Sequence, residues 1–331
     1  MTEPIAAALE ELGLPGLPEP LPAPVADSHT HYNSSVEMSG ISPELAIRAA
    51  AQVNVTRTAQ IGFDLPGSRF SCELAANNPS VIAAVAIHPN DAATLGDDLP
   101  QALAGIEELL TTYADQDWLR AVGETGMDRF RTRTPDGIAR QETSFAAHIA
   151  WCHRFDKTLV IHDRDAHSDI LSILDAEGVP NRVIMHCFSG DADFARACLD
   201  RGAWLSFPGT VTFKPNHHLR EALAITPDDK VLVETDAPFL TPEPLRGRRN
   251  SPYLLPITVR YTAAQRGIDP EDTDALADWC DQLLANTYAA FNGPWGGSGT
   301  GGSGAGGSGA GGSGAGGSGV GGSGTRESGA A

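Results

Sequence analysis

The stretch Val25-Ala-Asp-Ser-His-Thr-His-Tyr32 joins a short apolar start to two histidines that are two residues apart. Side chains alternate between the two faces of a β-strand, so His29 and His31 point the same way near the end of this strand. Two imidazoles directed at one point are the beginning of a divalent metal site. Such a pair is also compatible with surface or hydrogen-bonded histidines, and the rest of the chain has to decide between these interpretations.

Similar apolar segments recur along the chain, and helical patterns separate them. We expect strands at residues 25–31, 54–63, 81–88, 119–124, 157–162, 182–187, 203–208 and 230–236. Nearly continuous apolar strands are typical of a parallel sheet that helices cover on both faces. Eight such units predict a (β/α)8 TIM barrel, with extra C-terminal helices at about 251–266 and 270–291. An open doubly wound sheet is the competing fold, but no Gly-rich nucleotide-binding loop follows the first strand.

The two ends of the chain differ from this middle part. Residues 1–24 are expected to form a Pro-rich extension that begins with a short helix, and residues 25–295 the barrel. Residues 296–331 repeat Gly, Ser and Ala, a composition that predicts a disordered tail because it cannot bury a core. Within the barrel, we expect a loop between the first strand and a helix that starts at Ser42-Pro43.

Composition limits the function. The formal net charge of −19 argues against broad electrostatic contact with duplex DNA, although bound cations can supply the positive charge that a phosphate needs. Five cysteines without a Cys-x-x-Cys pair argue against a disulfide framework or a Cys-type zinc site and favour a cytoplasmic protein. We expect neither a secretory signal nor a membrane span. The oligomeric state is not indicated.

Polar residues interrupt the apolar strands at their carboxyl ends. In a barrel these ends meet around one opening, where active sites lie. The residues are His29, His31, Glu124, His162, His186 and Asp236. Histidines and carboxylates without thiolates suit Mg²⁺, Mn²⁺ or Zn²⁺. The set is too large for one open catalytic ion and predicts two neighbouring divalent cations, with Glu124 between them as a bridge.

These motifs resemble the TatD family of metal-dependent deoxyribonucleases, within the amidohydrolase-like superfamily. The matching segments are 27–31, 123–128, 160–166, 186–190, 234–240 and 246–250, and the resemblance spans about residues 25–291. It implies one ion held by His29, His31, Glu124 and Asp236, and a second held by Glu124, His162 and His186.

Three positions depart from the family pattern. Asn90 follows His88-Pro where the family commonly has a second histidine, and Asp163 replaces a usual serine. Arg129-Phe130 stands where an aromatic residue usually follows the aspartate. These departures concern the choice of substrate rather than the binding of metal.

The resulting hypothesis is a phosphodiesterase that cleaves DNA from an end or in single strands. A hydroxide that bridges the two ions is expected to attack phosphorus in line. Asp236 is the expected general base, and Glu234 is expected to orient the cluster or to share the proton transfer. Arg164 and Arg246 are expected to contact phosphate.

Two other functions stay open. One is a metal-dependent amide, lactone or aminoacyl-ester hydrolase of the same superfamily, and the other is a barrel that only binds a partner. Outside the ligand set, His88 is a candidate for substrate contact. Cys187 is expected to face the helix layer as part of the core, and His167, His217 and His218 are expected at the surface.

Overall fold

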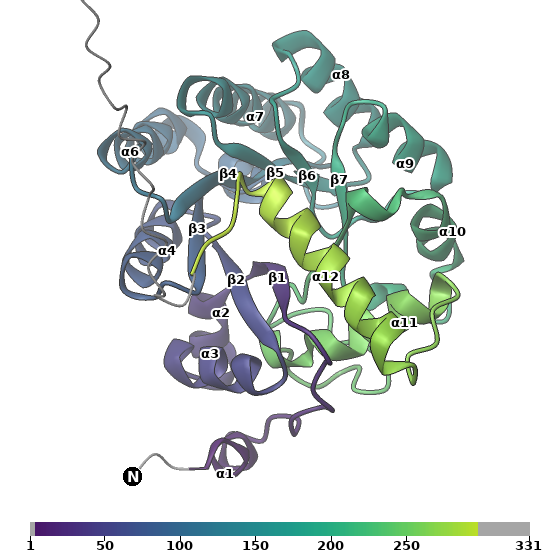
Figure 1. The fold of residues 1–331 in the computed structure, drawn as a ribbon. Helices are drawn as coiled ribbons and strands as arrows, with labels where there is room; N and C mark the ends of the chain where they lie inside the picture. The colour runs from purple at the N-terminus through teal and green to yellow at the C-terminus, as the bar shows by residue number, and fades with distance from the viewer. Residues whose placement is uncertain (1–3, 297–331) are drawn as a thin grey trace, which may run out of the picture. The chain divides into compact units, whose positions relative to one another are not determined.

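A computed structural model describes residues 4–296 as a closed barrel of parallel strands surrounded by helices (Figure 1). Neighbouring strands pair in sequence order from β1 to β8, and a parallel bridge between Thr30 and Ala237 joins the segment that follows the last strand to the first strand. The strands are β1 (Val25–Thr30), β2 (Val55–Ile61), β3 (Val81–Val85), β4 (Leu119–Asp128), β5 (Thr158–Arg164), β6 (Val183–Met185), β7 (Trp204–Phe207) and β8 (Val231–Val233). The predicted (β/α)8 barrel is confirmed.

Several helices begin at local start signals in the sequence. Ser42 accepts a hydrogen bond from the Leu45 amide, and Asp64, Thr134 and Asp191 cap other helices in the same way. The helices are α1 (Ile5–Glu11), α2 (Tyr32–Ser39), α3 (Pro43–Gln52), α4 (Leu65–Asn77), α5 (Pro89–Thr94), α6 (Leu99–Thr112), α7 (Pro135–Phe155), α8 (His167–Glu177), α9 (Ala192–Leu199), α10 (His217–Ile225), α11 (Leu255–Gln265) and α12 (Thr273–Ala290).

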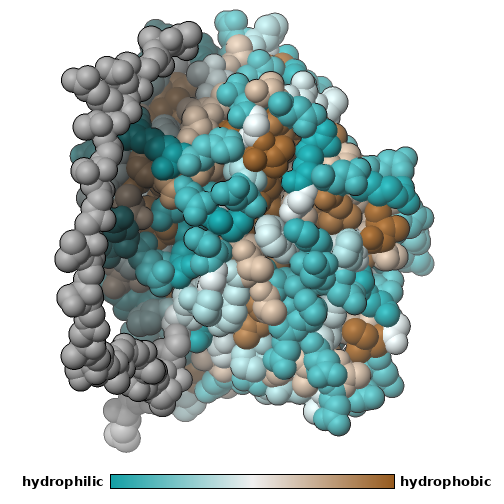
Figure 2. Space-filling view, turned by 45° about the horizontal axis from the view of Figure 1, so that its top comes forward, coloured by the Kyte–Doolittle hydropathy of each residue, from teal (hydrophilic) through white to brown (hydrophobic). Residues whose placement is uncertain are grey.

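Two apolar layers hold the barrel together. The outer layer packs the strands against the surrounding helices. The inner layer fills the barrel with small and branched side chains, among them Ala26, Ala59, Ala84, Val160 and Ile184. The coloured part of the face in Figure 2 is largely hydrophilic, with hydrophobic residues scattered over it. Apolar burial is therefore concentrated inside the barrel and beneath its helices.

The amino end of the barrel is covered by the chain that follows α12, which crosses close to β3 and β4 in Figure 1. Arg120 donates hydrogen bonds to the carbonyls of Phe291 and Asn292, and Arg57 donates to that of Trp295. The side chains of Phe291 and Trp295 are buried in the inner apolar layer. This segment therefore closes the end of the barrel opposite the carboxyl ends of the strands.

The N-terminal residues also pack on the barrel. Leu9, Leu14 and Leu21 are buried in the outer apolar layer. The Tyr253 hydroxyl donates to the Pro15 carbonyl, and Arg248 donates to the carbonyl of Gly13. Proline has no N–H but keeps its carbonyl oxygen as an acceptor. The proline-rich segment is thus fixed to the barrel through its backbone carbonyl oxygens.

Several expected boundaries were wrong. The expected loop after the first strand is helix α2, which ends where Gly40 adopts a left-handed conformation with φ of 72°. Strand β4 continues to Asp128 because Gly126 lets it pass close to β5, where an added Cβ would lie 2.1 Å from the His162 carbonyl oxygen. The expected tail at 296–331 lies outside the described residues, apart from residue 296. Within residues 4–296, no helix is both long and apolar enough to cross a bilayer.

Candidate metal centre

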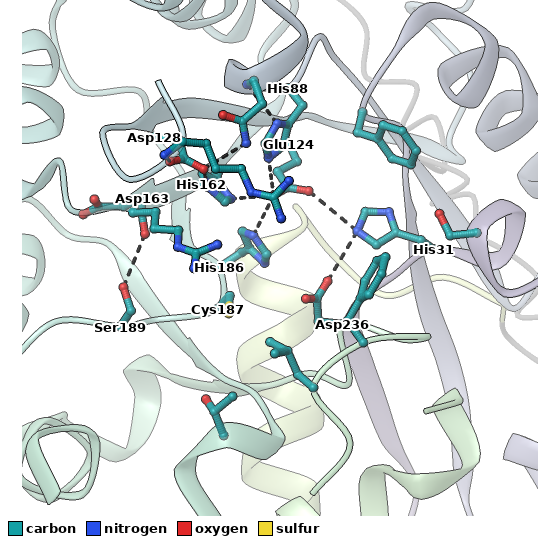
Figure 3. Close-up of a pocket in the computed structure, with 18 of the residues that line it drawn as sticks. His31, His88, Glu124, Asp128, His162, Asp163, His186, Cys187, Ser189 and Asp236 are labelled. Carbon is teal, nitrogen blue, oxygen red and sulfur yellow. Dashed lines mark hydrogen bonds and ion pairs between the residues drawn. The ribbon is translucent and has the colours of Figure 1, made fainter. Parts of the chain in front are cut away.

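The carboxyl ends of five strands bring the six predicted ligand residues together. His29 and the adjoining His31 belong to the end of β1, and Glu124 and His162 lie within β4 and β5. His186 and Asp236 follow the short strands β6 and β8. Figure 3 shows the labelled members of this set converging on one cavity.

Glu124 lies between the two halves of the set. Its Oε1 is 2.8 Å from Nδ1 of His162 and 2.9 Å from Nε2 of His186. Its Oε2 is 3.6 Å from Nε2 of both His29 and His31. Burial by itself raises the pKa of Glu124, but the charges of the surrounding imidazoles hold that pKa well below its usual value. The carboxylate is therefore ionised and faces both pairs of histidines.

Asp236 completes the half that contains His29 and His31. Nε2 of His29 lies 3.1 Å from Nε2 of His31, and Oδ1 of Asp236 lies 3.4 Å from the latter nitrogen. The His29 ring also stacks on His186 with centroids 3.8 Å apart. Imidazole nitrogens that approach one another beside carboxylates, with no thiolate among them, form a donor set that suits a divalent cation. The residues present therefore fit the metal site predicted from the sequence.

His88 adds a further imidazole that was expected only to contact substrate. Its Nε2 is 3.4 Å from Oε1 of Glu124, and donor atoms of His88, Glu124 and His162 lie within 4.8 Å of one another. The backbone amide of Asn90 donates to Nδ1 of His88, and the other ring nitrogen of His88 faces Glu124. The position of His88 at a strand end was the only signal in the sequence.

Asp128 was missed as a functional residue. It ends the extended strand β4, and its Oδ2 accepts a hydrogen bond from Asn90 and lies 3.5 Å from Nε2 of His162. The Arg131 amide donates to the other oxygen. Burial raises the pKa of Asp128, and these hydrogen bonds more than offset that effect, so the net pKa falls far below its usual value. A charged carboxylate thus lies beside the ring nitrogen of His162 that faces away from Glu124.

Two buried carboxylates support the centre from behind. Oε1 of Glu234 accepts a hydrogen bond from the Cys187 amide at 2.7 Å and lies 3.3 Å from Nδ1 of His186. Asp27 accepts hydrogen bonds from the His29 amide and the Thr235 hydroxyl, and burial raises its pKa to about 7. These contacts connect the ends of β1, β6 and β8, which carry three of the histidines and Asp236.

The centre opens into a cavity of about 660 Å³. Arg131, Arg164 and His218 lie in its wall, so the expected surface position of His218 is at the mouth of the cavity. Arg246 is outside the lining residues, and its guanidinium lies 4.4 Å from the centroid of the Phe213 ring. Of the two predicted phosphate contacts, the structure therefore brings only Arg164 to the cavity.

Cys187 does not face the helix layer, so that expectation was wrong. Strand β6 ends at Met185, and Cys187 has a left-handed φ of 44°, which turns its side chain into the cavity. Strand alternation therefore does not apply at this residue. Burial, together with nearby carboxylates, raises the pKa of the Cys187 thiol well above its usual value.

Comparison with known proteins places these features in a family. The family model described as TatD related DNase matches residues 26–280. The chain belongs to the TatD family. The TatD match includes all eight strands, apart from Val25 at the start of β1, and all six predicted ligand residues. Residues 5–21, which pack on the outer layer, precede it.

TatD relatives with curated sequences have the same general description. The uncharacterized metal-dependent hydrolase TatD of Mycobacterium tuberculosis is 41% identical over 251 residues, which are 75% of this chain and 92% of that protein. The uncharacterized metal-dependent hydrolase YabD of Bacillus subtilis is 36% identical over 72% of this chain and 88% of that protein. This TatD family member is a metal-dependent hydrolase.

Solved structures of TatD proteins have the same fold. YjjV, a TatD homolog from Escherichia coli, superposes with a TM-score of 0.70 at 24% identity, over 82% of this chain and 98% of that one. A TatD family hydrolase from Entamoeba histolytica superposes with a TM-score of 0.68 at 14% identity, over 83% and 99%. At these identities the likeness concerns the barrel itself.

Proposed function

We propose that this TatD protein is a two-metal phosphodiesterase that cleaves DNA from an end or in single strands. The observation that carries the proposal is the position of Glu124, whose two oxygens face different groups of histidines. A carboxylate in that position suits a bridge between two cations. Arg164 in the cavity wall supplies a site for phosphate in a chain whose net charge is −19.

Each half of the set would hold one divalent ion, either Mg²⁺, Mn²⁺ or Zn²⁺. His29, His31 and Asp236 would hold one together with Glu124, and His162 and His186 would hold the other with the same carboxylate. When bound, such ions neutralise phosphate charge and lower the pKa of water. His88 is close enough to Glu124 to join the second half.

The chain's own residues handle the proton. The Asp236 side chain faces the cavity, and the hydrogen bond from His31 and the neighbouring imidazoles lower its pKa against the opposing effect of burial. Asp236 is therefore ionised and accepts the proton of the attacking water as general base. Glu234 is fully buried behind His186, so it serves as a positioning residue. Arg164, on the side of the cavity across from Asp236, orients the phosphate.

A combined metal and digestion experiment tests the proposal. The purified protein is analysed for metal content and incubated with end-labelled single- and double-stranded DNA in Mg²⁺, Mn²⁺ or Zn²⁺. We expect shortening of single-stranded DNA and of duplex ends, and loss of both activities in Glu124→Gln. A metal-loaded protein that cleaves neither DNA would refute the assignment.

The acidic composition favours one second candidate, a metal-dependent amide, lactone or aminoacyl-ester hydrolase. A net charge of −19 repels nucleic acid outside the cavity, whereas small neutral substrates are unaffected. Arg164→Ala separates the two functions. It should lower DNA cleavage mainly by raising KM if phosphate is bound there. Unchanged DNA cleavage, together with rapid turnover of small esters or amides by the parent protein, would favour the second candidate.

A further inference from the structure

An aromatic wall borders the metal centre on the side of His31. Phe63 follows β2 and Phe239 follows β8, the two strands that flank β1 in the barrel. Both rings meet the His31 imidazole edge to face, with centroid distances of 5.5 Å and 6.3 Å, and both line the cavity. Phe239 is 42% exposed, which leaves a large apolar ring open to a polar site.

The backbone holds Phe239 in this exposed position. Asp236 and Leu240 on either side have left-handed φ values of 53° and 54°. The Phe239 amide donates to the Asp236 carbonyl, and the side chain of buried Asn250 donates to the Phe239 carbonyl at 2.6 Å. These bonds fix the backbone of Phe239, and with it the direction in which the side chain leaves the chain. Its exposure is a built feature of the cavity rim.

The opposite wall of the cavity is charged and carries two arginines beside the carboxylates of Asp128 and Asp163. Arg164 ends β5, which lies across the barrel from β1, and Arg131 follows β4. The Arg164 guanidinium lies 4.0 Å from the centroid of the Phe130 ring, which holds it at the rim. Figure 3 shows His31 and Asp236 on one side of the cavity and Asp163 and Ser189 on the other. The cavity therefore separates an apolar aromatic side from a charged side.

We propose that Phe239, with Phe63 beside it, is a subsite that stacks an unpaired nucleobase of the substrate. This inference rests on the proposed phosphodiesterase function and names the part of the substrate that this wall recognises. A nucleotide has the same division as the cavity, with a flat uncharged base at one end and an anionic phosphate at the other. With the cleaved linkage at Glu124, the base lies against Phe239 and the adjacent phosphate against Arg164. Stacking of this kind accepts every base.

The experiment compares two single-stranded oligonucleotides that differ only in the terminal residue, which either carries its base or is abasic. Loss of one base–aromatic stack lowers affinity by about 5- to 150-fold. We expect the parent protein to cleave the abasic substrate with a KM higher by about tenfold. Phe239→Ala should raise KM for the normal substrate to the abasic level, whereas Phe239→Tyr should keep the preference. Val36→Ala is the matched control, because Val36 is equally exposed, on α2, and lies outside the cavity lining.

A binding measurement separates the subsite from the reaction. An oligonucleotide with terminal 2-aminopurine loses fluorescence when that base stacks on an aromatic ring. We expect quenching by the parent protein and by Val36→Ala, and little quenching by Phe239→Ala. Equal cleavage of normal and abasic ends, or equal quenching by the parent and Phe239→Ala, would overturn the subsite and leave the nuclease function standing. Quenching that depends on Phe239 without any DNA cleavage would support the subsite and refute the phosphodiesterase.

Discussion

Lowering the pH should destabilise the fold through His148, which accepts a hydrogen bond from the residue that precedes His88 of the cavity lining. His148 is fully buried on α7, where Nε2 accepts the Ile87 amide and Nδ1 donates to the Ser144 carbonyl. Burial lowers the pKa of His148 from 6.5 to about 4. The folded protein keeps this ring neutral to about pH 4, whereas the unfolded chain binds the proton from about pH 6.5. Stability is therefore present above pH 6.5 and is lost toward pH 4, because the unfolded state then binds the extra proton.

The magnitude follows from the same displacement. Lowering the pH from 7 to 4 should reduce the free energy of unfolding by about 3 kcal/mol through His148 alone. At about 2 °C per kcal/mol for a chain of this size, this corresponds to about 6 °C in Tm. The assay records Tm against pH in the presence of a chelator for the parent protein and His148→Gln. The variant should be less stable at pH 7 but lose about 6 °C less between pH 7 and pH 4.

His153→Gln is the matched control, because His153 lies on the same helix but is exposed. Its curve should run parallel to that of the parent protein. The reasoning would be refuted if the His148→Gln curve were also parallel, or if the His148 imidazole signal titrated near pH 6.5 in the folded protein by NMR.

Three further predictions concern the metal centre, the amino end of the barrel and the C-terminal residues of the sequence. Glu124→Gln should stay folded, bind less of both ions and lose activity by several orders of magnitude, whereas His29→Gln should lose mainly one ion. Calorimetric metal titration and an activity assay measure both effects. If Glu124→Gln bound two ions tightly and kept normal turnover, Glu124 would not be a bridge. Arg120→Ala leaves the carbonyls of Phe291 and Asn292 without their donor and should lower stability by about 3 kcal/mol in chemical denaturation, and an unchanged midpoint would contradict this account. Deleting residues 297–331 should leave Tm and turnover nearly unchanged, since Gly and Ser offer little apolar surface, and a drop of several degrees would show that they contact the barrel.

The sequence by itself determined the barrel fold and the end of the barrel at which the candidate metal centre lies. Apolar strands that alternate with helices leave few stable arrangements other than a parallel sheet with both faces covered. The carboxyl ends of those strands then meet at one opening, and this does not depend on the conformations of the loops. For this reason His29, Glu124, His162 and His186 could be grouped although they are spread over nearly half of the chain.

Only the tertiary structure decided which residues surround the metal centre. At the strand ends the backbone is no longer extended, so the alternation of side chains between two faces no longer predicts where a side chain points. Cys187 turns into the cavity through a left-handed φ, and Asp128 reaches His162 because β4 continues past a glycine. Arg246 lies in a loop whose path no periodicity specifies, and it is directed to Phe213. Phe239 lies beside His31 in a turn whose backbone is held by a hydrogen bond from the Asn250 side chain. Such contacts depend on loop geometry and long-range hydrogen bonds, which local sequence patterns do not encode.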